Sequence, residues 1–238
     1  MLKCENVKKN FGSLVAVNNV SFEVGKGEVM GIAGPNGSGK TTLFNLITGI
    51  YSPQGKILLN DKKINGLPPY SICHCGIART FQIPKLFKNL SVYDNIRVGA
   101  HFGRNRKSGE ENQIIERMIE FVDLAGREHE FVEGLKLLDK KRLMIAIALA
   151  TEPNILLLDE PIAGLNPTEI LEAVKMFKKI NQELGLAIII IEHFMKVLIE
   201  LSEKLMILEN GQMIAFDAPE KVIKDKKVIE CYLGKNYA

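Results

Sequence analysis

The stretch GPNGSGKTT at residues 34–42 combines residue types that bind phosphate groups. Gly34, Gly39, Lys40 and Thr41 match the spacing G-x-x-x-x-G-K-[ST]. In such a loop, backbone N–H groups surround the phosphates, and the N-terminus of the following helix adds positive potential. The lysine reaches the β- and γ-phosphates, and the next hydroxyl binds Mg²⁺. We therefore expect a nucleotide and Mg²⁺ site. Its predicted residues are Gly34, Pro35, Asn36, Gly37, Ser38, Gly39, Lys40, Thr41 and Thr42.

A second group of candidate residues ends the apolar stretch ILLLDE at residues 155–160. The apolar run predicts a buried strand, and ligands of open α/β sheets collect at the carboxyl ends of strands. Asp159 is therefore expected to hold Mg²⁺, directly or through water. Glu160 is expected to take a proton from an attacking water molecule. The alternative, a solvated acidic turn, is disfavoured because a phosphate loop is present.

Several sequence patterns predict the elements that position these groups. Apolar runs at 29–33 and 186–191 predict two further buried strands. Alternating polarity in residues 1–28 predicts antiparallel strands. Asn166 and Pro167 predict a helix start. Strands that alternate with helices favour an α/β fold with a largely parallel sheet.

The composition limits the classes of function. The chain has 238 residues, 46% hydrophobic and 25% charged, which suits a globular domain with a core. Its 31 basic and 28 acidic residues are too balanced to favour nucleic-acid binding. Its four cysteines do not form a disulfide framework, which favours a reducing cytoplasm. The longest apolar runs are shorter than the roughly 18–20 residues of a membrane span. Membrane association is therefore expected through a partner.

Two further stretches make the pattern more specific. ARTFQ at 78–82 lies between the phosphate loop and Asp159, and IIIIEH at 188–193 ends a predicted strand with a histidine. In this order, these features resemble the ATP-binding subunit of an ABC transporter over essentially the whole chain. More narrowly, GIARTFQIPKLFKNLSVYDNI, GLNPTE and DKKVIECYLG resemble the ATPases of branched-chain amino-acid importers of the Liv type.

The resemblance implies a P-loop NTPase fold of the ABC ATPase type, with a mixed or parallel core sheet. It implies one domain over residues 1–238. Residues 1–83 and 151–238 would form the catalytic core with an N-terminal antiparallel β subdomain. Residues from about 84 to 150 would form a helical subdomain.

The resemblance also implies roles for single residues. Gln82 would contact Mg²⁺ and the attacking water, and its loop would sense the membrane partner. His193 would contact the γ-phosphate, so the catalytic set is Glu160, His193, Gln82 and Lys40. Phe11 would stack on adenine, and Val17 would join the nucleotide site. In the alternative interpretations, Gln82 is a surface residue, His193 is structural and Phe11 belongs to the core.

One segment departs from the family. The usual signature L-S-G-G-Q, which contacts ATP bound to a second subunit, falls in register on Leu135, Lys136, Leu137, Leu138 and Asp139. Only the first leucine agrees. Asp139 is a predicted helix N-cap, with Leu138 and Leu143 at the spacing of a hydrophobic staple. We expect either a weakened phosphate contact or a substitution in which Lys136 replaces the serine.

The resemblance therefore implies the ATP-hydrolysing subunit of an ABC importer on the cytoplasmic face of the membrane. The implied partners are transmembrane permease subunits, a second ATPase that is more readily a paralogue than a copy, and, indirectly, a substrate-binding protein. One alternative is a regulatory nucleotide-binding subunit with low turnover. Another is an ABC ATPase of translation or DNA repair, which would be expected to carry tandem domains or long insertions.

Overall fold

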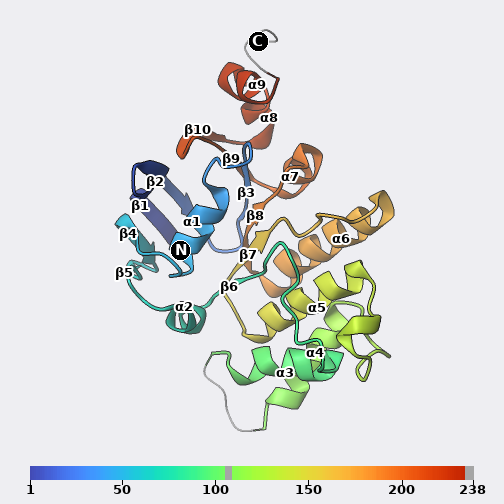
Figure 1. The fold of residues 1–238 in the computed structure, drawn as a ribbon. Helices are drawn as coiled ribbons and strands as arrows, with labels where there is room; N and C mark the ends of the chain where they lie inside the picture. The colour runs from blue at the N-terminus through green and yellow to red at the C-terminus, as the bar shows by residue number, and fades with distance from the viewer. Residues whose placement is uncertain (105–108, 234–238) are drawn as a thin grey trace.

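The structure, a computed structural model, describes residues 1–104 and 109–233 and contains two β-sheets (Figure 1). The larger sheet has the strand order β10-β9-β3-β8-β7-β6. Its strands are β3 (Val29–Ala33), β6 (Ile77–Arg79), β7 (Ile155–Asp159), β8 (Ala187–Ile191), β9 (Lys204–Glu209) and β10 (Gln212–Asp217). Five of them run parallel, and β10 pairs antiparallel with β9. The predicted α/β fold with a largely parallel sheet is confirmed.

The smaller sheet is antiparallel and has the strand order β2-β1-β4-β5. Its strands are β1 (Leu2–Phe11), β2 (Leu14–Val24), β4 (Gln54–Leu59) and β5 (Lys62–Lys63). Helix α1 (Lys40–Ile47) lies between the two sheets, and its Leu43, Phe44 and Ile47 are fully buried there. Helix α1, which follows the phosphate loop, is thus held in place by apolar packing against both sheets.

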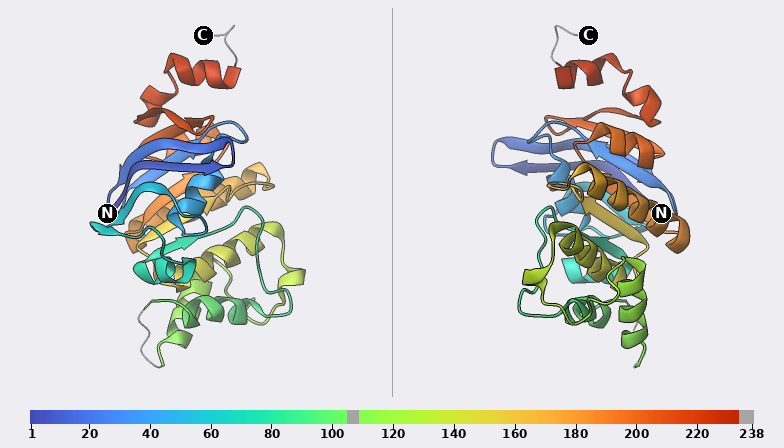
Figure 2. Two further views of the ribbon diagram at one scale, coloured as in Figure 1. Left: turned by 60° about the vertical axis from the view of Figure 1, so that its left-hand side comes forward. Right: turned by 90° about the vertical axis from the view of Figure 1, so that its right-hand side faces the viewer.

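The other helices extend from the larger sheet. They are α2 (Pro69–Cys75), α3 (Val92–His101), α4 (Glu111–Phe121), α5 (Leu137–Ala150), α6 (Pro167–Leu184), α7 (Met195–Leu201), α8 (Pro219–Val222) and α9 (Lys226–Leu233), with a 3₁₀ turn at Val132–Gly134. Helices α3, α4 and α5 pack together at one end of the molecule, and α9 lies at the opposite end (Figures 1 and 2). Helices α3, α4 and α5 lie within residues 84–150, the segment expected to be a helical subdomain. Because α5 also shares the core of the larger sheet, the subdomain boundary stays a prediction.

Local sequence signals explain the start of α6 and the turn of the β9–β10 hairpin. The Asn166 side chain accepts the Glu169 N–H while Glu169 accepts the Asn166 N–H, a capping box before Pro167. Asn210 and Gly211 have positive φ values of 48° and 77°, as a tight two-residue turn requires. Within residues 1–104 and 109–233, the structure contains no helix with the length and apolar character to cross a membrane.

Candidate active site

The loop between β3 and α1 has the geometry of a phosphate-binding loop. Gly34, Gly37 and Gly39 have positive φ values of 148°, 77° and 103°. A Cβ on Gly34 would collide with the carbonyl oxygen of Leu208, and one on Gly39 with that of Ala16. Gly39 is the N-cap of α1 and has no side chain to cap the helix. The first-turn N–H groups of α1 are therefore available to an anion.

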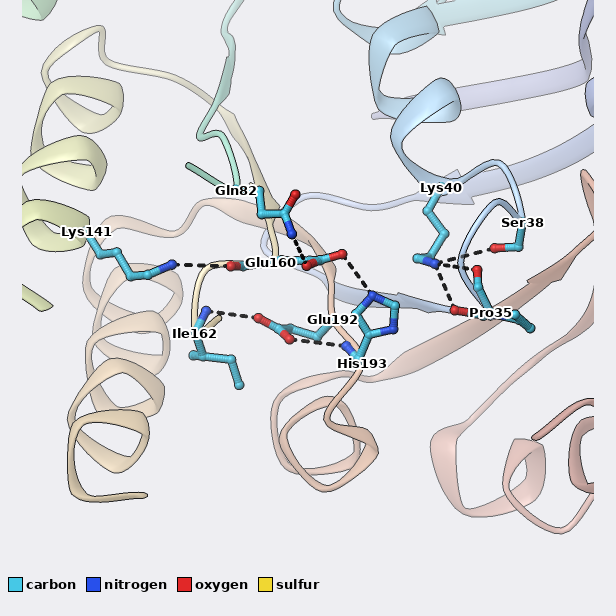
Figure 3. Close-up of polar contacts among 10 residues, drawn as sticks. Pro35, Ser38, Lys40, Gln82, Lys141, Glu160, Ile162, Glu192 and His193 are labelled. Carbon is cyan, nitrogen blue, oxygen red and sulfur yellow. Dashed lines mark hydrogen bonds and ion pairs between the residues drawn. The ribbon is translucent and has the colours of Figure 1, made fainter. Parts of the chain in front are cut away.

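Lys40 is folded back over this loop (Figure 3). Its ammonium donates to the carbonyl oxygens of Gly34 at 2.8 Å and Pro35 at 2.9 Å, and to the Ser38 hydroxyl at 3.5 Å. Burial lowers the pKa of Lys40, and the carboxylates of Glu160 and Asp159 partly offset that shift. The ammonium is thus held beside the loop, and it can exchange a carbonyl contact for a phosphate.

A cavity of about 430 Å³ opens over the phosphate loop. Its lining residues are Phe11, Leu14, Val15, Ala16, Asn36, Gly37, Ser38, Gly39, Lys40, Thr41, Thr42, Glu160 and Asn210. The Phe11 ring lies edge-on to Tyr51, with the ring centroids 5.1 Å apart, and keeps 42% of its surface exposed. This exposure does not fit a core residue, and Phe11 remains available to stack on a base.

The structure corrects the expectation for Val17. Its side chain is fully buried in the core between the antiparallel sheet and α1, so it cannot contact a ligand in the cavity. Neighbouring strand residues point to opposite faces, and Ala16 lines the cavity instead.

Glu160 joins the ends of three adjacent parallel strands (Figure 3). Its Oε2 accepts from Gln82 Nε2 at 2.6 Å, and its Oε1 lies 2.9 Å from His193 Nε2. Gln82 follows β6, Glu160 follows β7 and His193 follows β8. Since Glu160 also lines the cavity with Lys40, the structure brings the four residues of the predicted catalytic set to one place.

Arg79 holds the carboxylate of Asp159, a contact that the sequence analysis missed. Arg79 Nη2 lies 2.7 Å from Asp159 Oδ2, and Arg79 Nη1 donates to Asn45 Oδ1 at 2.6 Å. The guanidinium lies over the rings of Phe44 and Phe81. Both ion-paired side chains are only 6% exposed. The sequence signal was the arginine three residues before Gln82, in the stretch ARTFQ.

The residues expected to hold Mg²⁺ present the oxygen donors that this ion prefers. Thr41 is exposed in the cavity. Gln82 donates to Glu160 through its nitrogen, so its amide oxygen retains acceptor capacity. Asp159 contacts Arg79 through one carboxylate oxygen and keeps a second one. The donor set therefore fits Mg²⁺, and one of its members, Asp159, is also paired with Arg79.

The signature position differs from the expectation. Helix α5 begins at Leu137 with Lys136 as its N-cap, so Asp139 is not the cap. The Asp139 carboxylate instead contacts Arg127 at 2.7 Å and Arg142 at 3.5 Å, and these charge-assisted contacts stabilise it in place of a cap. Among the described residues, no side chain caps this helix.

The predicted hydrophobic staple is also wrong. With the cap at Lys136, Leu138 and Leu143 no longer occupy the staple positions. Leu135 and Leu138 are buried in the core, whereas Leu137 keeps 40% of its surface exposed. Lys136 and Leu137 are therefore the side chains that this position offers to a second subunit.

The Cys73-His74-Cys75 stretch lies in α2, away from this site. His74 Nε2 contacts the carbonyl oxygen of Phe102 at 3.2 Å. In the part of the chain that the structure describes, no three His, Cys, Asp or Glu side chains form a cluster that could hold a metal ion.

Comparison with known proteins agrees with this geometry. A family model described as ABC transporter matches residues 17–163, which includes the phosphate loop, Gln82 and Glu160. The chain belongs to this family. As an ABC ATPase it binds and hydrolyses ATP, and ATPases of this family act in pairs together with membrane permeases.

Several members of the family match this chain over nearly its full length. It is 34% identical over 252 residues to the high-affinity branched-chain amino acid transport ATP-binding protein LivG of Escherichia coli, covering 99% of this chain and 98% of LivG. The ADP conformation of the ATP-binding cassette MJ1267 superposes with a TM-score of 0.88 at 31% identity, with 99% of each chain covered. A dimeric post-hydrolysis structure of the cassette MJ0796, bound to ADP and Pi, superposes with a TM-score of 0.81 at 26% identity, covering 92% of this chain and 99% of that one.

Proposed function

We propose that this ABC ATPase drives an importer for branched-chain or related amino acids. The carrying observation is the Glu160 carboxylate, which bonds to Gln82 and lies against His193 while it lines the same cavity as Lys40. The full-length similarity to LivG supports the substrate class. The chain would sit on the cytoplasmic face of the membrane, attached through permease subunits near the Gln82 loop, with a substrate-binding protein delivering the amino acid from the other side.

The proposed mechanism assigns each side chain a step. Lys40 binds the β- and γ-phosphates after it releases a loop carbonyl. Glu160 orients the attacking water and takes its proton, and His193 holds the γ-phosphate in line. Mg²⁺, held by Thr41, Asp159 and Gln82, would neutralise charge on the phosphates. Phe11 stacks on the adenine ring.

We further infer that the second ATPase is a paralogue and that the two ATP sites differ. ATP on this chain's phosphate loop would meet the partner's signature and be hydrolysed. ATP on the partner would meet Lys136 and Leu137. The first turn of α5 and Lys136 still favour an anion, but the Leu137 side chain keeps the backbone further from the phosphates than glycine would. ATP on the partner's phosphate loop would therefore still bind but would be hydrolysed slowly.

The test uses the transporter complex that co-purifies with this chain, placed in proteoliposomes. Glu160→Gln is expected to lower Mg²⁺-dependent ATP hydrolysis about a hundredfold or more and to stop ATP-driven leucine uptake. Glu28→Gln is the matched control, because Glu28 also accepts a backbone N–H, from Gly25 at 2.7 Å, but lies outside the cavity lining. Leucine uptake that survives Glu160→Gln would overturn the proposal. Equal loss from the equivalent change in the partner would overturn the asymmetry.

A further inference from the structure

Glu192 is a buried carboxylate that the proposed mechanism does not use. It follows β8, and only 2% of its surface is exposed. One oxygen accepts the Ile162 N–H at 2.9 Å, and the other accepts the His193 N–H at 3.2 Å (Figure 3). Burial raises its pKa to about 7, so charging it inside the fold is costly. These contacts therefore connect the segment after β8, which carries Glu192 and His193, with the loop after β7.

The turn that carries Glu160 needs contacts of this kind. Glu160 has a φ of 47°, a left-handed conformation that is unfavourable for a residue with a side chain. Such conformations persist where the surrounding contacts hold them. The Glu160 N–H donates to the Ile191 carbonyl oxygen at 2.9 Å, and two residues later the Ile162 N–H is held by Glu192. Glu192 therefore secures the far side of the turn.

Lys141 approaches the same turn from α5. It is 2% exposed, and its ammonium donates to the Glu160 carbonyl oxygen at 3.4 Å. Burial lowers the pKa of Lys141, and the nearby carboxylates of Glu192 and Glu160 oppose that shift. The charge of Glu192 is thus partly balanced from the helix that begins at the signature position.

We propose that Glu192 is a positioning residue for ATP hydrolysis, whose carboxylate joins the Glu160 turn to the His193 strand end and fixes the two catalytic side chains relative to each other. The inference rests on the proposed roles of Glu160 and His193. Glu192 itself contacts neither the nucleotide nor the water. Its loss should therefore reduce the rate of hydrolysis and leave ATP binding in place, because Lys40 and the phosphate loop make none of its contacts.

The experiment measures kcat, KM and ATP affinity in the co-purified complex for Glu192→Gln and for the double variant Glu192→Gln with Lys141→Met. Glu192→Gln places an amide N–H₂ against one of the two backbone donors. We expect kcat to fall about tenfold or more, because a misplaced catalytic group loses rate steeply. KM and the affinity for a non-hydrolysable ATP analogue should stay within about twofold of the unmodified protein, as in Glu28→Gln.

The double variant separates positioning from stability. It removes both buried charges, so its melting temperature should return toward that of the unmodified protein while kcat stays low. If kcat recovers along with the melting temperature, Glu192 is structural and the proposal is wrong. Glu160→Gln and His193→Ala are measured in the same assay. If these two retain the rate, the proposed site roles fail; if they lose it while Glu192→Gln keeps full kcat, only the positioning inference fails.

Discussion

The stability of the protein should depend on pH through Glu192. Burial is the main cause that raises its pKa from 4.5 to about 7 in the folded chain. The folded protein therefore holds this proton more tightly than the unfolded chain does. The resulting stability is fully present below pH 4.5 and is lost as the pH rises through about 7. Glu192→Gln removes the titrating group and with it this pH dependence.

The size of the effect follows from the shift. Each unit of pKa shift corresponds to about 1.4 kcal/mol, so the step from 4.5 to about 7 amounts to about 3 kcal/mol of unfolding free energy. For a chain of this length, about 1 kcal/mol moves the melting temperature by about 2–4 °C. Relative to the unmodified protein, the melting temperature of Glu192→Gln should therefore rise by roughly 6–12 °C between pH 4.5 and pH 8.

The assay is thermal unfolding of the two proteins, followed by circular dichroism in half-unit pH steps from 4.5 to 8. The hydrogen bond that glutamine cannot make lowers the variant's melting temperature at every pH and does not affect the trend. Glu28→Gln corrects for the general effect of losing one carboxylate. The reasoning is refuted if the melting temperature of Glu192→Gln, relative to that of the unmodified protein, stays constant or falls as the pH rises.

Three further predictions concern stability and binding. Arg79→Met leaves the buried Asp159 carboxylate without its cation and should cost about 3–5 kcal/mol in denaturant unfolding; a cost under about 1 kcal/mol would show that the pair is not buried in solution. Asn166→Ala removes the capping box of α6 and should lower the free energy of unfolding by about 1 kcal/mol. An unfolding curve that matches the unmodified protein would contradict a stabilising cap. Gly39→Ala sets a Cβ against the Ala16 carbonyl oxygen at a φ of 103°, and should abolish binding of a fluorescent ATP analogue; retained micromolar binding would contradict the close packing of the loop.

The phosphate loop could be predicted because its requirements are local. The glycines and Lys40 act within one turn of chain, and flanking apolar runs show that a strand precedes them and a helix follows. The same holds for the helix start at Asn166 and Pro167, where neighbouring residues determine the backbone.

The contacts that the sequence did not show join residues far apart in the chain. Arg79 and Asp159 are 80 residues apart, and they pair because β6 and β7 are adjacent in the sheet. Asp139 was expected to cap a helix, a local role, but Arg127 approaches it from the preceding loop and its carboxylate is used there. Val17 was expected at the nucleotide site, but it lies in β2, where the alternation of side chains turns it into the core. Each of these outcomes depends on tertiary packing, which a single sequence does not display.

The pairing of Asp139 changes the physical reason for the proposed difference between the two ATP sites. A carboxylate in contact with two guanidiniums contributes little net charge at a distance, so it adds little repulsion to a partner's phosphates. Leu138 is turned into the core and is out of reach. What remains is the exposed Leu137 at the first turn of α5, together with a cationic Lys136 in place of a hydroxyl. The departure from the family is therefore mainly steric: the helix end still attracts an anion, but a side chain separates the anion from the backbone that would align it.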